Sequence, residues 1–216
     1  MSSLDSILIP SKAGNIEAAI KQPATVDDIN WVVICHPHPL MGGDLRNPVV
    51  RSIADHLFEK NISTLALNFR GVGLSSGSYD NGIGELEDAL SAIDYLKTYQ
   101  GINHCKIGIA GYSFGAHIAL KTTIYHNIVA FLVGLTKFDT EIHRSIKPST
   151  ELSLVIGEHD SRFDSESFDY ISSKLSTKPE INVIRDTDHF FSGKESLVGS
   201  FASNFFTNSF RHRNNL

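Results

Sequence analysis

The sequence predicts an α/β fold: a mostly parallel sheet of about eight strands, helices on both faces, an antiparallel N-terminal hairpin and no cap domain. Two observations carry this prediction. From residue 31 onward, short apolar segments of strand length alternate with longer segments of helical periodicity. In addition, segments such as residues 31–35 (Trp-Val-Val-Ile-Cys) are apolar throughout, as expected for strands that are covered on both faces.

The predicted elements follow one another in a simple order. Two short segments around a turn that contains Gly14 and Asn15 form the hairpin, Leu4–Pro10 and Ile16–Lys21. Helices are recognised by apolar residues at a spacing of three or four, with acids favoured in the first turns. The later predicted strands are Trp31–Cys35, Thr64–Phe69, Ile107–Ala110, Val129–Leu135, Leu152–Ile156 and Asn182–Arg185, and the predicted helices are Asn47–Lys60, Gly84–Tyr99, Phe114 to about Tyr125, Ser165–Leu175 and Glu195–Phe210.

Length and composition limit the classes of protein to consider. A chain of 216 residues is most simply one domain, 1–216, and a net charge of −5 disfavours nucleic acid or an anionic membrane as the main partner. The N-terminus has no basic segment followed by an apolar one, and no apolar stretch approaches the ~18 residues of a membrane span. We therefore expect a cytoplasmic protein, with Cys35 and Cys105 as buried, reduced thiols. The sequence leaves the oligomeric state open.

The most informative motif is Gly-Tyr-Ser-Phe-Gly at residues 111–115. The Gly-x-Ser-x-Gly pattern alone is weakly specific, but here it joins a predicted strand to a predicted helix. Such a sharp turn strains the backbone of Ser113, and the two flanking glycines relieve the crowding. The N-terminus of the following helix directs unpaired N–H groups and a positive dipole end toward the serine hydroxyl. A turn of this kind holds a nucleophile.

A serine nucleophile needs a base and a carboxylate that orients the base. Asp160 lies in the loop just after the strand Leu152–Ile156, and His189 lies in the loop after the next strand. Both loops are at the carboxyl ends of strands, where ligands bind in sheets of this type. The order serine, aspartate, histidine is the one used by hydrolases with this strand–turn–helix motif. Ser113, Asp160 and His189 are therefore the predicted catalytic residues.

Other acids compete for the role of Asp160. Asp164, Asp186 and Asp188 lie in the same two loops, and single loop aspartates are usually turn or cap residues. Asp188 is adjacent in sequence to the predicted base, and adjacent side chains seldom orient each other well. Glu158 and His159 are interpreted as turn residues or as part of the rim.

The loop His-Pro-His-Pro-Leu-Met-Gly-Gly, residues 36–43, follows the strand Trp31–Cys35 directly. Hydrolases with this motif take one oxyanion donor from the residue after the nucleophile, here the Phe114 N–H, and a second from such a loop. The two prolines of the loop have no N–H, so the second donor is His38, Leu40 or a neighbour, and we favour His38 slightly.

Two further features are explained by structural roles. His36 and His38 share one face of an extended chain, but no acids or cysteines complete a metal site with recognisable spacing, so a structural role is expected and no metal is implied. The glycine-rich segment 70–77 lacks the spacing of dinucleotide-binding or Walker-type loops. Arg70 is predicted to be an ion-pair partner that holds this loop.

Taken together, residues 36–43, residues 68–73 (Asn-Phe-Arg-Gly-Val-Gly), the Ser113 turn and residues 188–191 (Asp-His-Phe-Phe) closely resemble the α/β-hydrolase superfamily. The resemblance covers almost the whole chain and is nearest to small, lidless serine hydrolases related to dienelactone hydrolases and esterases. It implies Ser113 as nucleophile, Asp160 as acid and His189 as base. Dienelactone hydrolases proper have cysteine at the nucleophile position, so Ser113 departs from them. Larger relatives insert a cap where this chain has only the 16 residues Thr136–Glu151, which implies an open, shallow site.

The expected function is hydrolysis of carboxylic esters, or thioesters, of small acyl groups through an acyl-enzyme. No cofactor is implied, and the expected partner is a small-molecule ester. Two alternatives stay open: a small peptidase or amidase of the same fold, and a catalytically silent hydrolase fold that serves as a binding module.

Overall fold

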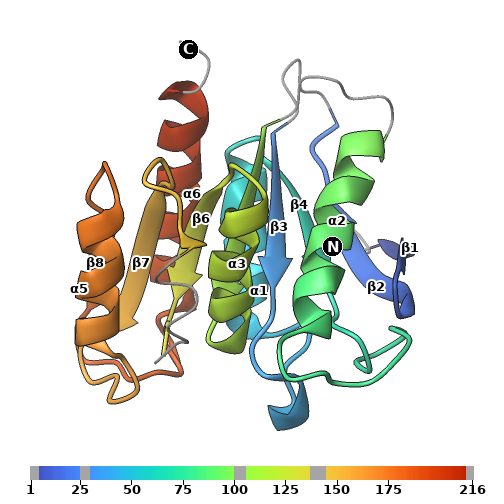
Figure 1. Cartoon of the computed structure of the whole chain (residues 1–216), viewed down its shortest axis with the longest axis horizontal. Helices are drawn as coiled ribbons and strands as arrows, with labels where there is room; N and C mark the ends of the chain where they lie inside the picture. The colour runs from blue at the N-terminus through green and yellow to red at the C-terminus, as the bar shows by residue number, and fades with distance from the viewer. Residues whose placement is uncertain (1–4, 25–29, 100–105, 137–144, 213–216) are drawn as a thin grey trace.

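The computed structural model describes residues 5–24, 30–99, 106–136 and 145–212. Its centre is an eight-stranded sheet with the strand order β1-β2-β4-β3-β5-β6-β7-β8 (Figure 1). The strands are β1 (Asp5–Ser11), β2 (Gly14–Lys21), β3 (Trp31–Cys35), β4 (Ser63–Leu67), β5 (Ile107–Tyr112), β6 (Val129–Val133), β7 (Leu152–Gly157) and β8 (Glu180–Ile184).

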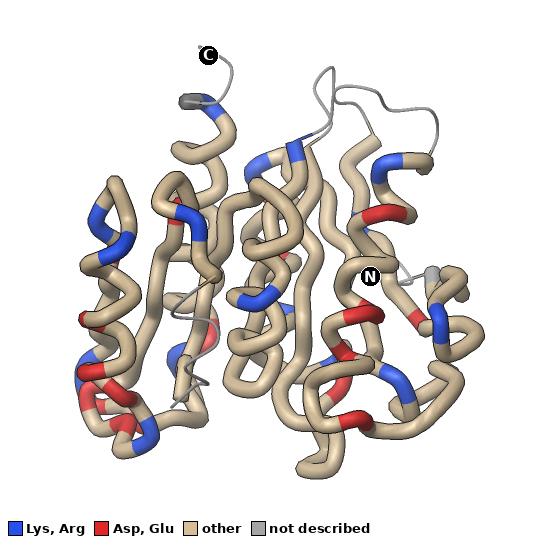
Figure 2. Tube along the Cα trace, viewed as in Figure 1, with Lys and Arg blue, Asp and Glu red and all other residues tan. Residues whose placement is uncertain are grey.

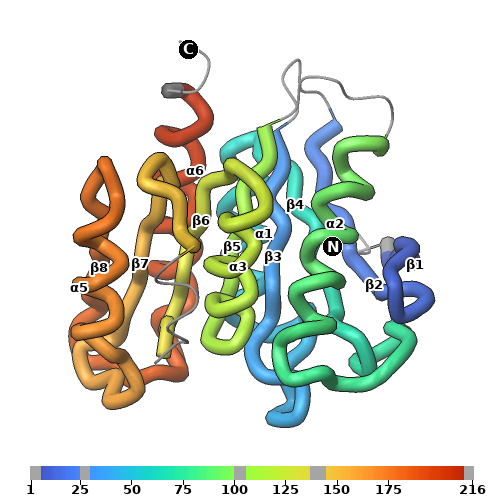
Figure 3. The backbone as a smooth tube through the Cα atoms, in the orientation of Figure 1, coloured from blue at the N-terminus to red at the C-terminus, as the bar shows by residue number. Residues whose placement is uncertain are grey.

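Most of the sheet is parallel, as predicted. The hairpin β1–β2 is antiparallel and pairs antiparallel with β4, whereas every later pair, from β3–β4 to β7–β8, is parallel. The carboxyl ends of the parallel strands therefore lie at one edge, the lower edge in Figure 3, where the loops that follow β3, β4 and β7 gather. This edge is where the candidate site residues were expected.

Helices cover both faces of the sheet. One face carries α2, α3 and α5, which stand in front of the sheet in Figure 1, and the other carries α1 and α6. The bounds are α1 (Pro48–Glu59), α2 (Gly84–Thr98), α3 (Phe114–Tyr125), α5 (Ser165–Lys174) and α6 (Glu195–His212), and η1 (Pro39–Met41) is a short 3-10 helix. None of the helices in the described ranges is long and apolar enough to cross a bilayer.

Two apolar cores result from this layering. Alternate residues of β3 point to opposite faces, so Val33 and Cys35 join the core under α2, α3 and α5, while Val32 and Ile34 join the core under α1 and α6. Cys35 is a fully buried free thiol, and burial raises its pKa, as expected for an inert cysteine. Cys105 lies outside the described residues.

Several predicted boundaries shift by one or two residues, and two of these shifts have clear causes. β4 ends at Leu67 rather than Phe69. The next N–H groups bind side chains instead of strand carbonyls: the Phe69 N–H donates to His36 Nε2 at 3.1 Å and the Arg70 N–H donates to Asp88 Oδ2 at 2.9 Å. β6 ends at Val133 because Gly134, with a φ of 55°, turns the chain. Of the segment 136–151, whose shortness predicted the absence of a cap, the structure describes residues 136 and 145–151.

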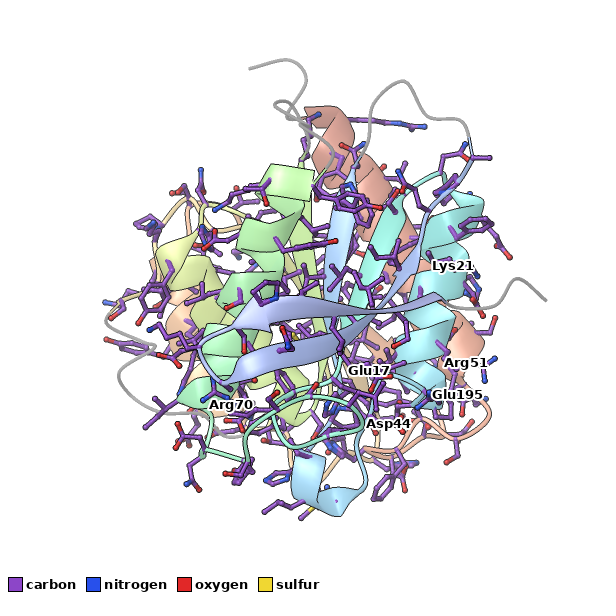
Figure 4. All side chains as sticks on the ribbon, turned by 90° about the vertical axis from the view of Figure 1, so that its right-hand side faces the viewer. Glu17, Lys21, Asp44, Arg51, Arg70 and Glu195 are labelled. Carbon is purple, nitrogen blue, oxygen red and sulfur yellow. The ribbon has the colours of Figure 1, made fainter. Side chains whose placement is uncertain are left out.

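A set of buried polar side chains, which we call the loop network, holds the segment after β4. It consists of Glu17, Asn68, Arg70 and Asp88. Glu17 accepts hydrogen bonds from the Asn68 side chain (2.8 Å) and the Leu74 N–H (2.9 Å). Arg70 donates to both oxygens of the fully buried Asp88 carboxylate, at 3.0 and 3.1 Å. The predicted structural role of Arg70 is thereby confirmed. Figure 4 shows Glu17 on the hairpin that crosses the front of that view, and Arg70 beside it.

Charged residues are spread over the chain in both signs (Figure 2). Helix α2 shows a favourable arrangement, because its first turn carries Glu85 and Glu87 and its last turn carries Lys97. Glu85 also accepts hydrogen bonds from the N–H groups of Asp80 and Gly82, which fixes the loop that enters the helix.

Candidate active site

Ser113 lies alone between the end of β5 and the start of α3, as the Gly-x-Ser-x-Gly pattern predicted. Its backbone has a φ of 54° and a ψ of −113°, a conformation that costs a non-glycine residue on the order of 1–3 kcal/mol. The strained turn is held because the Ser113 N–H donates to the Val133 carbonyl at 2.8 Å and the Ser113 carbonyl accepts from the Ala116 N–H at 2.9 Å. The side chain therefore stands at the carboxyl edge, where a reacting group needs access.

The two glycines of the motif are required by close packing. A Cβ at Gly111 would lie 2.1 Å from the Gly115 carbonyl oxygen, and a Cβ at Gly115 would lie 2.3 Å from the Cys35 carbonyl oxygen. These separations are far below van der Waals contact. Only glycine at both positions lets α3 start this close to β5 and β3.

The structure brings the three predicted side chains into one hydrogen-bonded chain. His189 Nε2 lies 2.9 Å from Ser113 Oγ, and His189 Nδ1 lies 2.8 Å from Asp160 Oδ2. Because an ionised carboxylate only accepts, Nδ1 carries the proton in the neutral ring, and the lone pair of Nε2 faces the serine hydroxyl. This is the tautomer that a base for Ser113 needs.

Asp160 is placed to remain ionised. Burial alone would raise its pKa, but the hydrogen bonds from His189 and from the Arg162 N–H (3.0 Å) hold the pKa below its ordinary value of 3.8. Its side chain is fully buried, and that of His189 is 6% exposed. The carboxylate therefore orients the ring from a position that solvent does not reach.

Backbone bonds tie together the loops that carry Asp160 and His189. The His159 N–H donates to the Thr187 carbonyl at 2.9 Å, and the Glu158 N–H donates to the Ile184 carbonyl at 2.9 Å. Gly157 is needed at this crossing, since a Cβ there would lie 2.5 Å from the Asp188 carbonyl oxygen. The two loops thus hold the acid and the base at a fixed separation.

Sequence reasoning missed the role of Tyr112, the residue before Ser113. Its hydroxyl donates to the His189 carbonyl at 2.9 Å in a buried position, and its ring lies 5.8 Å from the His189 ring. Burial, together with the nearby carboxylates of Asp160 and Asp188, raises the pKa of Tyr112 to about 12, so the hydroxyl keeps its proton. A tyrosine inside the Gly-x-Ser-x-Gly motif was the available signal, but its partner is 77 residues away in the chain.

The competing acids have other contacts. Asp164 caps α5 by accepting from the Ser167 N–H at 3.2 Å. Asp188 accepts from the Phe190 N–H at 2.9 Å, which closes a tight turn around His189. Asp186 is exposed and has a φ of 51°. In the described structure, the carboxylate that reaches His189 is that of Asp160.

The two candidates for a second oxyanion donor differ. The Leu40 N–H is used, because it donates to His38 Nδ1 at 3.2 Å, and Leu40 is 71% exposed. The N–H groups of Met41 and Gly43 both donate to the His38 carbonyl. The backbone N–H groups of His38 and of Phe114, the first residue of α3, have no acceptor among the residues that the structure describes. His38 is held in place by contacts of its ring with Phe114 and Tyr79, both at 5.0 Å.

Ser113 opens onto two pockets that meet at its side chain, and His38, Met41 and Arg162 border both. The first has a volume of about 170 Å³ and is lined by Pro37, His38, Met41, Gly42, Gly43, Asn47, Tyr112, Ser113, Arg162, His189 and Phe190. The second has a volume of about 350 Å³ and is lined by His38, Met41, Ser113, Phe114, His117, Thr136 and Arg162. Leu40 lines neither.

His36 and His38, considered above as metal ligands, make hydrogen bonds within the protein. His36 is buried, donates from Nδ1 to the Pro37 carbonyl and accepts the Phe69 N–H on Nε2 at 3.1 Å, and burial lowers its pKa to about 4. It thus links the ends of β3 and β4. In the described ranges, the residues whose ligand atoms converge within 4.8 Å are Glu158, His159 and Asp186, all exposed on the outer side of the acid and base loops.

The chain is similar to known hydrolases. Residues 77–203, which include the Ser113 turn, Asp160 and His189, match the model of the dienelactone hydrolase family. An uncharacterised protein of Rickettsia prowazekii (strain Madrid E) is 28% identical, and the match covers 94% of this chain and 90% of that protein.

Solved structures show the same fold. An α/β serine hydrolase homologue from Coxiella burnetii is 29% identical with a TM-score of 0.83, covering 94% of this chain and 98% of that one. A serine hydrolase without a lid from Xanthomonas campestris, 24% identical, has a TM-score of 0.81 and covers 94% of each chain. A putative α/β hydrolase from Agrobacterium tumefaciens, 23% identical, has a TM-score of 0.84 and covers 96% of this chain and 97% of that one.

Proposed function

This chain belongs to the dienelactone hydrolase family, has the α/β-hydrolase fold and is a hydrolase, and on that basis we propose that it is a serine hydrolase of carboxylic esters or thioesters. The observation that carries the proposal is the unbroken chain of bonds from Ser113 Oγ through His189 to Asp160, at 2.9 and 2.8 Å. The expected partner is a small-molecule ester.

The first half of the reaction forms an acyl-enzyme. His189 Nε2 takes the hydroxyl proton as Ser113 Oγ attacks the carbonyl carbon of the ester. Asp160 stabilises the imidazolium that forms. The carbonyl oxygen becomes an oxyanion, for which the N–H groups of Phe114 and His38 are the available donors. When the bond to the leaving oxygen or sulfur breaks, the imidazolium returns the proton to the leaving group.

The second half releases the acid. A water molecule loses a proton to His189 Nε2 and attacks the acyl carbon, and the bond to Ser113 Oγ breaks as the proton passes to the serine. The products are one alcohol or thiol and one carboxylic acid. Each step uses side chains or backbone N–H groups of this chain.

The proposal is tested by labelling with a fluorophosphonate probe, followed by mass spectrometry of the labelled peptide. We expect a covalent adduct on Ser113 and turnover of p-nitrophenyl acetate, and Ser113→Ala should abolish both. Undiminished turnover by this variant would remove Ser113 from the mechanism. A wild-type protein that neither reacts with the probe nor turns over any ester would support the binding module instead.

The choice among acyl substrates is tested separately. Rates on a series of acyl esters and thioesters are compared with rates on aminoacyl amides of similar size. Faster turnover of the amides, normalised to their uncatalysed rates, would favour the peptidase or amidase.

A further inference from the structure

Two apolar side chains at the rim of the site are largely exposed. Met41 on η1 is 80% exposed and Phe190, next to the predicted base, is 57% exposed. Both line the pocket of about 170 Å³ that opens at Ser113. Exposed apolar side chains that gather around a pocket mark a binding surface. A ligand with an apolar group would remove both from water.

The chain around Phe190 is built to keep its ring at the rim. The Phe190 N–H donates to Asp188 at 2.9 Å, and the following residue, Phe191, has a φ of 55° and is fully buried. This strained residue separates an inward ring from an outward one. The Arg162 guanidinium lies 5.4 Å from the centroid of the Phe190 ring, and the His189 ring lies edge-on at 5.9 Å. Phe190 is therefore held on two sides and open toward the pocket.

The position of His189 tells which part of an ester this pocket receives. His189 and Phe190 line only the first pocket, whereas Phe114 and His117 border only the second. The leaving oxygen takes its proton from His189 Nε2 and so lies on the His189 side of Ser113. The acyl chain then extends toward the second pocket.

The volume of the first pocket limits the size of the leaving group. Apolar cavities of about 150 Å³ hold a benzene molecule, and this pocket has about 170 Å³. We propose that Met41 and Phe190 form a leaving-group subsite, selective for esters or thioesters whose alcohol or thiol part is apolar and about the size of one ring. The proposal rests on the proposed serine hydrolase function and adds the substrate class.

The test compares two ratios of kcat/KM. The alcohol ratio is benzyl acetate over methyl acetate, which share the acyl group and have alcohols of similar acidity. The acyl ratio is methyl butyrate over methyl acetate, which share the alcohol. We expect Phe190→Ala to lower the alcohol ratio about tenfold, because an apolar contact made by the benzyl group is lost. Met41→Ala should lower the alcohol ratio as well, and Phe190→Leu should recover part of it. Because Phe190 lines only the first pocket, the acyl ratio should stay constant in Phe190→Ala, whereas Met41 also borders the second pocket.

Leu74→Ala is the matched control. Leu74 is 67% exposed and follows β4 in the loop at the same edge, but it lines neither pocket. Its substitution should leave both ratios unchanged. An unchanged alcohol ratio in Phe190→Ala and Met41→Ala, or a change confined to the acyl ratio in Phe190→Ala, would overturn the subsite while ester turnover and Ser113 labelling persist. Failure of the proposed function itself is different: the wild-type protein would then show no labelling and no turnover of any ester, and the subsite would fall with it.

Discussion

Two groups of buried polar side chains lie near the carboxyl edge of the sheet, and they differ in where their hydrogen bonds end. In the loop network, Glu17 accepts from Ser6, Asn68 and Leu74, and both oxygens of Asp88 accept from Arg70. Every bond closes within the protein.

The chain through Asp160 and His189 is closed at only one end. Asp160 is satisfied by His189 and the Arg162 N–H, but the other end is a half-buried Ser113 hydroxyl beside two pockets. Both groups are buried, so burial of polar side chains does not by itself identify a reactive site. Better signs are the N–H groups of His38 and Phe114, which have no acceptor among the described residues, and the strained backbone of Ser113 beside a pocket.

The largest effect is expected on turnover, when the carboxylate that orients His189 is replaced. Asp160→Asn should lower kcat by about 10⁴-fold, because the amide favours the wrong tautomer of His189. Asp188→Asn is the matched control, since asparagine can still accept the Phe190 N–H, and its kcat should stay close to that of the wild type. Steady-state kinetics on one ester measure both. Equal losses in the two variants would contradict the assignment of Asp160.

The loop network should respond in stability instead. Arg70→Ala leaves the fully buried carboxylate of Asp88 without its partner, which costs about 3–5 kcal/mol of unfolding free energy. Urea unfolding measures this loss. As a control, Lys97→Ala breaks the exposed Lys97–Asp94 pair and should change stability by less than about 0.5 kcal/mol. If Arg70→Ala prevents folding, Arg70→Lys, which keeps the charge without the bidentate geometry, gives a smaller loss. A loss from Arg70→Lys no larger than that from Lys97→Ala would contradict the role of the network.

A smaller effect is expected at the bond between Tyr112, at the end of β5, and His189, in the loop after β8. Tyr112→Phe removes the hydroxyl that donates to the His189 carbonyl and should cost about 1–3 kcal/mol of stability. Turnover should fall by a few-fold at constant KM, because the base is less well held. Thermal unfolding and kcat, measured on the same preparation, check both parts. An unaltered kcat would show that the loop bonds alone position His189.

The smallest effect is the pH dependence of stability. Because the pKa of Asp160 is lower in the folded than in the unfolded chain, the carboxylate stabilises the fold above its unfolded pKa of about 3.9. That contribution is lost as the pH falls through the lowered folded value. The difference in unfolding free energy between wild type and Asp160→Asn should therefore shrink as the pH falls from the unfolded pKa of about 3.9 through the lowered folded value. A difference that stays constant over this range would contradict the lowered pKa.

Much of the fold and the three proposed catalytic residues could be predicted from the sequence. Strands buried on both faces leave continuous apolar runs, and the Ser113 turn needs glycines at fixed positions, so both leave local signals. The approach of Asp160 and His189 could be inferred because both follow adjacent parallel strands, which end at the same edge.

Other contacts left no such signal. The bond from Tyr112 to His189 and the capture of the Leu40 N–H by the His38 ring depend on side-chain directions in irregular loops. The early end of β4 depends on the Phe69 and Arg70 N–H groups meeting the side chains of His36 and Asp88. Apolar periodicity records which residues are buried, but it does not record which polar atoms become partners.

The crowding at Gly115 has a consequence for how such an enzyme changes over time. Replacement of this glycine would push a helix away from the centre of the sheet, so selection can hardly alter the turn that bears the serine. Met41 and Phe190 contribute little to folding, because much of each side chain is in water. New specificities would thus arise by exchange at those two positions, with the reactive machinery inherited unchanged.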